Sequence, residues 1–136
     1  MISIPVRALV EEKDPSLELE VVAGGKGLSK KIVIPQIQKP GLALTGYTSN
    51  LHPGRVQVLG NSEIHFLKNL PGGKAAKIIK KICRMDIACL VVTHGNQAPL
   101  TLEKEAERSS IPVLKTPLPT PVFILRITKF LEERLT

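Results

Sequence analysis

An amphipathic segment, 74–84, is followed closely by an uninterrupted apolar run, 87–92. This order limits the folds that the chain can adopt more than any other feature of the sequence. In the first segment, apolar residues recur at the spacing i, i+3, i+4, i+7 and i+8 from Ala75, which predicts one buried face of a helix. The second segment, IACLVV, is typical of an interior parallel strand that is covered on both sides. A helix followed by such a strand indicates a right-handed crossover in a parallel α/β sheet.

The segments before and after this unit show the same alternation of strand and helix patterns. Strands are predicted at 17–21, 32–34, 56–59 and 111–114, and a helical turn is predicted at 42–44. Helices are predicted from residue 61 or 62 to residue 70, from residue 100 or 101 onward, and over 122–135. The apolar residues expected on the buried faces of the first and last of these helices are Ile64, Phe66, Leu67, Leu70, Ile124, Ile127, Leu131 and Leu135. The sequence therefore predicts one α/β domain over residues 1–136, with a mainly parallel sheet flanked by helices.

The chain is long enough, at 136 residues of which 43% are apolar, to bury a core without a disulfide or a metal ion. Aromatic residues make up only 3% of it, so Ile, Leu, Val and Ala must fill most of the core. Cys83 and Cys89 are predicted to be reduced and buried. The sequence contains no recognisable signal peptide and no apolar run approaching about 20 residues. These properties predict a cytoplasmic protein that makes no contact with a membrane.

The net charge of +7 raises the question of an acidic partner. Lys74, Lys77, Lys81 and Arg84 form a basic stripe on the predicted helix, and such a stripe can neutralise nucleic-acid phosphates. Binding of single strands also uses aromatic side chains for stacking, and only Tyr47 is predicted to be free for that role. A basic stripe opposite an apolar face is most often the solvated side of a helix. We therefore interpret the stripe as solvated and expect no nucleic-acid binding.

No set of residues has the spacing of a complete catalytic site. The segments 24–29, GGKGLS, and 72–75, GGKA, have the composition of a phosphate-binding loop without its G-x-x-x-x-G-K-[ST] spacing, and both are interpreted as plain loops. The G-x-S-x-G motif around a nucleophilic serine does not occur. His52, His65 and His94 each stand alone, without a second residue at metal-ligand spacing. We therefore expect no catalytic activity and no bound metal ion within residues 1–136.

Four residues are candidates for binding a ligand or a partner, namely Tyr47, Arg55, Gln57 and His94. His94 follows the buried strand at its carboxyl end, where open α/β sheets place ligands. Arg55 and Gln57 begin a strand, and either Gln57 occupies a solvent-facing or edge position or the pair forms a polar surface for a partner subunit or a small anion. Tyr47 is the only tyrosine and lies in a loop. It either covers the core beneath that loop or anchors a homo-oligomer together with Arg55.

Several segments, in the same order along the chain, resemble a known family. The segments 39–47, KPGLALTGY, and 55–64, RVQVLGNSEI, are similar to the patterns R/K-P-G-[LI]-x-L-[TA]-G-[YF] and R-[ILV]-Q-[VL]-[LF]-G-x-[TS]-E-[LI] of the amino-terminal domain of HPr kinase/phosphorylase. The stretches IPVL and LPT within 111–120 and the opening VRALV at 6–10 are also similar to that family's pattern. This chain departs from the family after Tyr47, where TSNL replaces the aromatic residues of many members, and at His94, where members have Arg.

The resemblance implies a bacterial enzyme that phosphorylates and dephosphorylates a serine of the phosphocarrier protein HPr, and so acts in carbon catabolite repression and the sugar phosphotransferase system. ATP, Mg²⁺ and the catalytic residues are implied only for a carboxy-terminal kinase domain, whose motifs do not occur in these 136 residues. The resemblance implies for the amino-terminal domain a fold similar to the first domain of the Mur ligases, and we expect it to act as a non-catalytic regulatory and assembly domain. The alternative is a stand-alone sensor that binds a phosphorylated or nucleotide metabolite through Lys26, Arg55 or His94.

Overall fold

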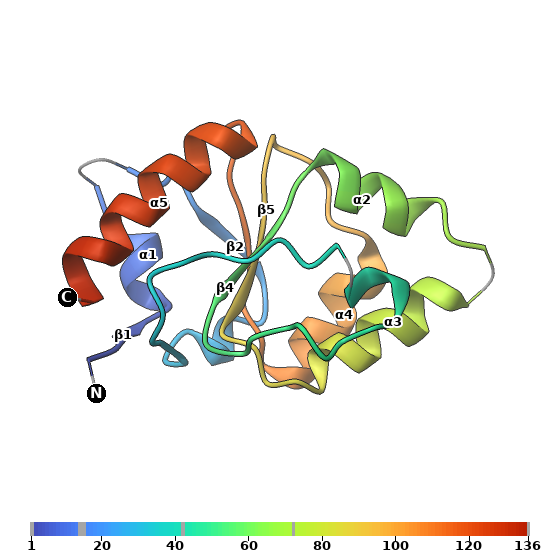
Figure 1. The fold of residues 1–136 in the computed structure, drawn as a ribbon. Coiled ribbons are helices and arrows are strands. Elements are labelled where there is room, and N and C mark those ends of the chain that lie inside the picture. Colours follow the sequence, from blue (N-terminus) through green and yellow to red (C-terminus); the bar gives the residue numbers. More distant parts are fainter. Residues whose placement is uncertain (1, 14–15, 42, 72, 136) are drawn as a thin grey trace.

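A four-stranded sheet forms the middle layer of the molecule (Figure 1). The computed structural model describes residues 2–13, 16–41, 43–71 and 73–135. The order of strands is β2-β6-β5-β4, with β2 at Glu20–Ala23, β6 at Val113–Lys115, β5 at Cys89–Val92 and β4 at Val56–Leu59. Strands β4, β5 and β6 are parallel, and β2 pairs antiparallel with β6. The predicted mainly parallel α/β sheet is therefore confirmed.

The parallel strands are joined by helices that cover one face of the sheet. Helices α2 (Asn61–Lys68) and α3 (Lys74–Cys83) connect β4 to β5, and α4 (Leu100–Ser109) connects β5 to β6. Every residue of β5 is buried, because the strand lies between two neighbours and between two helical layers. The amphipathic helix and the interior strand predicted from the sequence are thus both confirmed.

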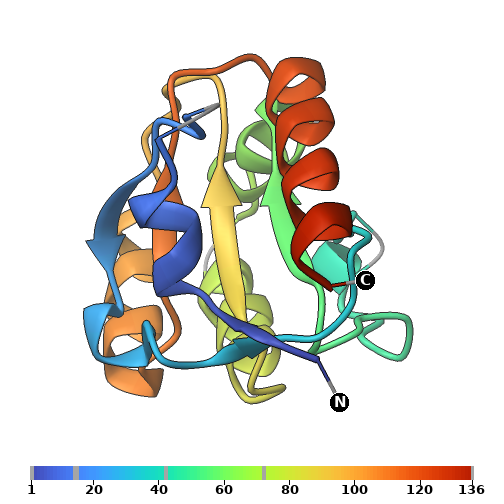
Figure 2. The same cartoon turned by 90° about the vertical axis from the view of Figure 1, so that its left-hand side faces the viewer.

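The opposite face of the sheet is covered by the two ends of the chain (Figure 2). Helix α5 (Thr120–Leu135) and the short helix α1 (Arg7–Glu11) lie on this side, beside a small antiparallel pair of strands, β1 (Ile4–Pro5) and β3 (Lys31–Ile32). Alternate strand residues point to the two faces, as the period of a strand requires. Consequently Val58 and Val91 pack with α5, whereas Leu59 and Val92 pack with α3 and α4.

Three predicted strands have different bounds in the structure. The strand expected at 17–21 begins only at Glu20, because Glu18 has φ 52° and its left-handed backbone interrupts the extended conformation. The strand expected at 32–34 is β3, and the strand expected at 111–114 is β6. The predicted helical turn is the 3₁₀ helix η2 (Ala43–Thr45), and Leu42 of that prediction lies outside the described residues.

Two predicted helix faces also need correction. Phe66 is exposed, because it lies two residues from Ile64 and so about 200° around the helix from it. In α5 the fully packed stripe begins at Phe123 rather than at Ile124, which is only half-buried. The residues buried along that helix are Thr120, Phe123, Ile127, Phe130 and Leu131. Within the described part of the chain, no helix is long and apolar enough to cross a bilayer.

Candidate functional site

The carboxyl ends of the three parallel strands meet where the chain changes sides of the sheet. Strands β4 and β5 lead into α2 and α4 on one face, whereas β6 leads into α5 on the other face (Figure 1). Open α/β folds bind ligands in the crevice that such a change of direction creates. This end of the sheet is therefore the candidate site.

Two buried threonines join the layers at this point. The Oγ1 atoms of Thr93, directly after β5, and Thr120, at the start of α5, lie 2.6 Å apart. Thr93 Oγ1 also lies 3.4 Å from the carbonyl oxygen of Leu59. Gly60 follows Leu59 and leaves room for this pair, since a Cβ atom on Gly60 would lie only 2.9 Å from Thr120 Oγ1. The ends of β4, β5 and α5 are thus held in direct contact.

A partly buried ion pair closes the same cluster. Glu63 Oε1 accepts a hydrogen bond of 2.6 Å from the Gly60 backbone N–H and lies 3.4 Å from Lys39 Nζ. The carboxylate therefore satisfies an amide at the start of α2 and meets the positive end of that helix. Glycine has no side chain to return the bond, so Glu63 supplies only half of a capping box. Lys39, Gly60, Glu63, Thr93 and Thr120 are called the junction below.

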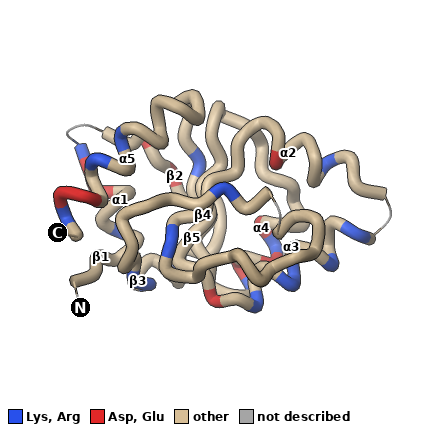
Figure 3. The backbone as a smooth tube through the Cα atoms, viewed as in Figure 1, with Lys and Arg blue, Asp and Glu red and all other residues tan. Residues whose placement is uncertain are grey.

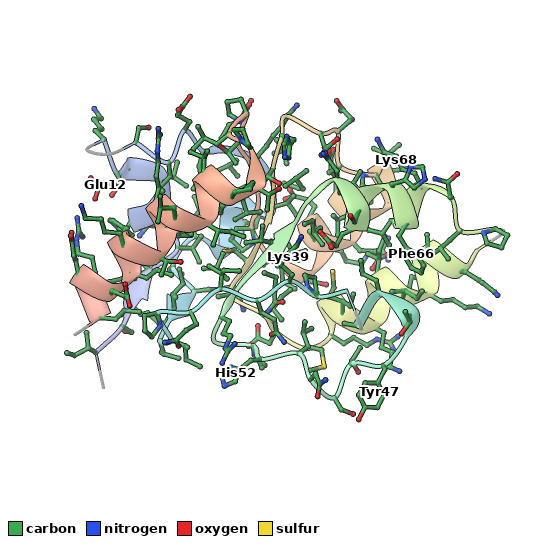
Figure 4. The ribbon with its side chains drawn as sticks, turned by 45° about the horizontal axis from the view of Figure 1, so that its top comes forward. Glu12, Lys39, Tyr47, His52, Phe66 and Lys68 are labelled. Carbon is green, nitrogen blue, oxygen red and sulfur yellow. The ribbon has the colours of Figure 1, made fainter. Side chains whose placement is uncertain are left out.

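Lys39 reaches the junction because its segment runs along the free edge of β4. The Gln38 N–H donates to the Val56 carbonyl at 2.9 Å, and the Val58 N–H donates to the Gln38 carbonyl at 2.8 Å. Pro40 follows directly, and proline has no N–H to donate to a further strand. The segment blocks the edge of the sheet and carries Lys39 (Figure 4). The Lys39 ammonium group lies beside the Glu63 carboxylate.

His94 lies just beyond the carboxyl end of β5, where its backbone has a local role. It has φ 60° and an exposed side chain, and its N–H donates to the Leu118 carbonyl at 2.9 Å. The next amide, of Gly95, donates to the Thr116 carbonyl at 2.9 Å. Through these two hydrogen bonds, His94 and Gly95 hold the loop after β5 against the loop after β6.

A surface hollow of about 490 Å³ lies beside the junction. The Asn96 side chain spans one side of it, where Nδ2 donates to Asn61 Oδ1 at 2.7 Å and to the Thr93 carbonyl at 3.0 Å. None of the four predicted binding residues lines this hollow. Its lining residues are Asn61, Ser62, Ile64, His65, Lys68 and Asn96.

Gln57 and Arg55 lie at the opposite end of the sheet from His94. Gln57 is fully buried, and its Nε2 donates to Gln38 Oε1 and to the His52 carbonyl, each at 3.1 Å. Gln57 was expected at a solvent-facing or edge position. It lies on the edge strand β4, but its side chain does not face solvent, because the segment with Gln38 covers that edge. Arg55 is half-buried, and its Nε atom is shielded from solvent.

Tyr47 is exposed over 53% of its surface, so it does not cover the core beneath its loop. Its loop is attached to α3, because Lys81 Nζ donates to the Gly46 carbonyl at 2.6 Å. Lys81 is exposed with the rest of the basic stripe, as predicted, yet it holds a neighbouring loop as well. Tyr47 and Arg55 were predicted to anchor an interface together. Of the two, only Tyr47 is an exposed residue, because Arg55 is half-buried.

The glycine-rich loop around Lys26 has a packing function. A Cβ atom on Gly24 would lie 1.8 Å from the Ile111 carbonyl oxygen, and one on Gly27 would lie 1.9 Å from the Ser110 carbonyl oxygen. The Gly24 N–H donates to Glu107 Oε1 at 2.9 Å, so this amide faces a carboxylate. The loop therefore packs its backbone against another segment. In the second predicted loop, Gly72 lies outside the described residues.

Cys83 and Cys89 are free and buried, as predicted. Burial raises the pKa of Cys89 to about 12. Burial, together with the charge of Glu105, raises the pKa of Cys83 to about 11. Both thiols are thus poor nucleophiles. Among the described residues, no group of three or more His, Cys, Asp or Glu side chains is arranged to hold a metal ion.

The sequence reasoning missed four side chains of the junction, namely Lys39, Glu63, Thr93 and Thr120. Thr93 could have been found from its position directly after the apolar run 87–92. Glu63 lies three residues after Gly60, the spacing of a helix cap, so its contact with the Gly60 amide was also accessible to sequence reasoning. The pairing of Lys39 with Glu63 depends on how distant segments pack.

Comparisons with known proteins agree on one family. The model of the family described as "HPr Serine kinase N terminus" matches residues 4–131. The HPr kinase/phosphorylase of Geobacter sulfurreducens is 50% identical over 134 residues, which cover 98% of this chain and 42% of that protein. The HPr kinase/phosphorylase of Leptospira biflexa is 33% identical over 132 residues, which cover 97% of this chain and 41% of that protein. The chain thus spans about two fifths of the length of these relatives.

A solved structure of similar fold is that of the CBS and DRTGG domains of the regulatory region of Clostridium perfringens pyrophosphatase, in complex with its activator diadenosine tetraphosphate. The TM-score is 0.53, and the match covers 96% of this chain and 53% of that one. The two sequences are 15% identical, so the likeness concerns the fold alone.

Proposed function

Because the chain belongs to the family of HPr serine kinase N-terminal domains, we propose that it is a non-catalytic regulatory and assembly domain of an HPr kinase/phosphorylase. The observation behind this proposal is the coverage of the relatives, since the match takes in nearly the whole chain but only 42% of the Geobacter protein. In this proposal, phosphoryl transfer to HPr belongs to the remaining part of the parent enzyme. The domain serves that enzyme in the cytoplasm, within carbon catabolite regulation and the phosphotransferase system.

The contacts within the junction support a positional role for its polar groups. The Glu63 carboxylate is held by a backbone amide and a lysine, and the two threonine hydroxyls hold each other. Phosphoryl transfer depends on groups that bind phosphates and metal ions and orient the attacking oxygen. The groups of the junction instead hold protein segments together.

The same contacts suggest how the domain regulates its parent. Helix α5 begins at the junction with Thr120, and α2 begins there with Gly60 and Glu63. A movement of Lys39 or of the first turn of α2 would shift Gly60. Because Gly60 packs closely against Thr120, this shift would move the start of α5. We propose that α5 transmits such a displacement to the rest of the enzyme.

The proposal is tested with the parent enzyme and two of its derivatives. Purified residues 1–136 should transfer no labelled phosphate from ATP to HPr. The parent without these residues should still transfer phosphate, but its oligomeric state in sedimentation or its response to effectors should change. Phosphate transfer by residues 1–136 alone would contradict the proposal. Unchanged regulation and assembly after the deletion would contradict it equally.

A further inference from the structure

Half of the aromatic side chains of this protein lie on its surface. Phe123 and Phe130 are buried in the core, with exposed fractions of 0% and 4%. Tyr47 and Phe66 are exposed over 53% and 38% of their surfaces. In a chain with one Tyr, three Phe and no Trp, two exposed rings are a notable share, and aromatic residues are enriched in protein interfaces.

The two rings flank η2, and a hollow of about 220 Å³ lies between η2 and α2. Phe66 of α2 and Leu44 of η2 both line this hollow. Most of the exposed lining is carbon, so the hollow suits an apolar side chain of a partner. The lining residues are Gly41, Leu44, Thr45, Ser62, Glu63 and Phe66.

The most basic part of the chain lies on α3, which contacts η2 (Figure 3). Residues 74–84 include five Lys and Arg and no Asp or Glu. None of these five side chains forms an ion pair with any described residue. Lys74 and Lys77 lie in the first turns of α3, where cations oppose the helix dipole. The stability of α3 therefore does not account for these lysines.

Helix α3, the loop with Tyr47 and the hollow adjoin one another at η2, which contacts α3 and lines the hollow. Lys81 Nζ donates to the carbonyl of Gly46, the residue before Tyr47, and so joins the loop to α3. The loop in turn follows η2, which lines the hollow next to Phe66 (Figure 4). The surface formed by Tyr47, Phe66, Lys74, Lys77, Lys81 and the hollow is called the α2–α3 face below.

We propose that the α2–α3 face docks an acidic protein surface that places an apolar side chain in the hollow between η2 and α2. The unpaired cations of α3 complement acidic residues and steer their approach. A second copy of this face would bring the same basic stripe and no complementary acidic one, and like charges in an interface cost binding energy. A nucleic acid would complement the stripe but would leave the apolar hollow unfilled.

The test uses two synthetic peptides as probes and the whole chain as the receptor. One peptide consists of Glu and Ala with a single central Phe, and in the other Ala replaces that Phe. The Phe peptide should bind about tenfold more tightly, because it buries an aromatic ring in the hollow. Binding of both peptides should weaken as the salt concentration rises.

Variants separate the two parts of the face. Lys74→Glu with Lys77→Glu should abolish binding of both peptides, and the thermal midpoint should hold or rise because glutamates suit the start of a helix. Phe66→Ala should remove the preference for the Phe peptide and leave the salt-dependent binding. Lys104→Glu with Lys129→Glu, which reverses two exposed charges on α4 and α5, should leave both affinities unchanged.

Several results would overturn the proposal. Equal affinity for the two peptides would show that the hollow takes no side chain. An equal loss of binding in the control variant would show that only net charge matters. Tighter binding of an oligonucleotide at the same salt, lost in Lys74→Glu with Lys77→Glu, would assign the face to nucleic acid. A dimer in sedimentation that Phe66→Ala dissociates would assign it to a second copy.

Discussion

At some glycines, a neighbouring backbone segment lies so close that the position has no room for a side chain. Gly27→Ala places a Cβ atom 1.9 Å from a backbone oxygen that cannot move aside easily. We expect it to lower the free energy of unfolding by about 2 kcal/mol or more in urea. Gly25→Ala is the matched control in the same turn, because its Cβ atom would meet only Val21 at 3.9 Å. Equal stability of the two variants would show that the packing of this loop is different.

The two cysteines should be protected from alkylation in the folded chain. Burial raises the pKa of Cys83 to about 11 and of Cys89 to about 12, so little thiolate forms at neutral pH. Mass spectrometry should find no label before unfolding and two labels afterwards. Fast labelling of either thiol in the native protein would contradict its burial.

The same pKa shifts predict how stability changes at alkaline pH. Both thiols hold their proton more tightly in the folded chain than in the unfolded one, where the ordinary pKa of 9.0 applies. Their contribution to stability is therefore complete below pH 9.0 and is lost as the pH rises towards about 11 and about 12. Between pH 9.0 and about 12, the free energy of unfolding measured in urea should fall less for Cys89→Ala than for the unmodified chain.

At the scale of an element, the packed side of α5 differs by one residue from the side predicted by periodicity. The two stripes share Ile127 and Leu131, but the large ring of Phe123 replaces Ile124 at the core. Phe123→Ala should lower the free energy of unfolding by about 3–5 kcal/mol. Leu125→Ala, on the outer side of the same helix, should change it by less than about 0.5 kcal/mol. Similar losses in both variants would contradict this orientation of α5.

The basic side of α3 is exposed, but its lysines are not equivalent. Lys77→Ala removes a side chain with no hydrogen bond to any described residue, whereas Lys81→Ala releases the Gly46 carbonyl. Because Lys81 is exposed, we expect a loss of only about 0.5 kcal/mol in urea unfolding, together with faster amide exchange around Tyr47. Equal exchange in the two variants would show that the bond does not hold the loop.

At the scale of the whole molecule, the junction couples the two helical layers across the ends of the sheet. Thr93→Val or Thr120→Val leaves the other hydroxyl without its partner at 2.6 Å and should cost about 1–2 kcal/mol. The double variant should cost less than the sum, since it removes both groups of one interaction. Thr101→Val, on the half-buried side of α4, is the control and should change little. Strict additivity would show that the hydroxyls are not coupled.

Much of the fold was predictable because it depends on local patterns. The apolar period of 74–84 and the unbroken apolar run 87–92 identified α3 and β5, since a helix face and an interior strand leave such patterns in the sequence itself. The missing phosphate-loop spacing was also a local property. The chain therefore specified its α/β class and its crossovers without reference to distant residues.

The candidate site could be predicted only in part, because it depends on contacts between distant segments. The apolar run 87–92 placed His94 at the carboxyl end of a buried strand, where the structure has it, yet no local pattern pairs Lys39 with Glu63 or Thr93 with Thr120. Gln57 was expected at a solvent-facing or edge position, and it lies on the edge strand β4, but Gln38, nineteen residues earlier, covers its side chain. Periodicity reports that one side of an element is buried. Which segment covers an edge, and which side chains then meet, is decided by the packing of the whole chain.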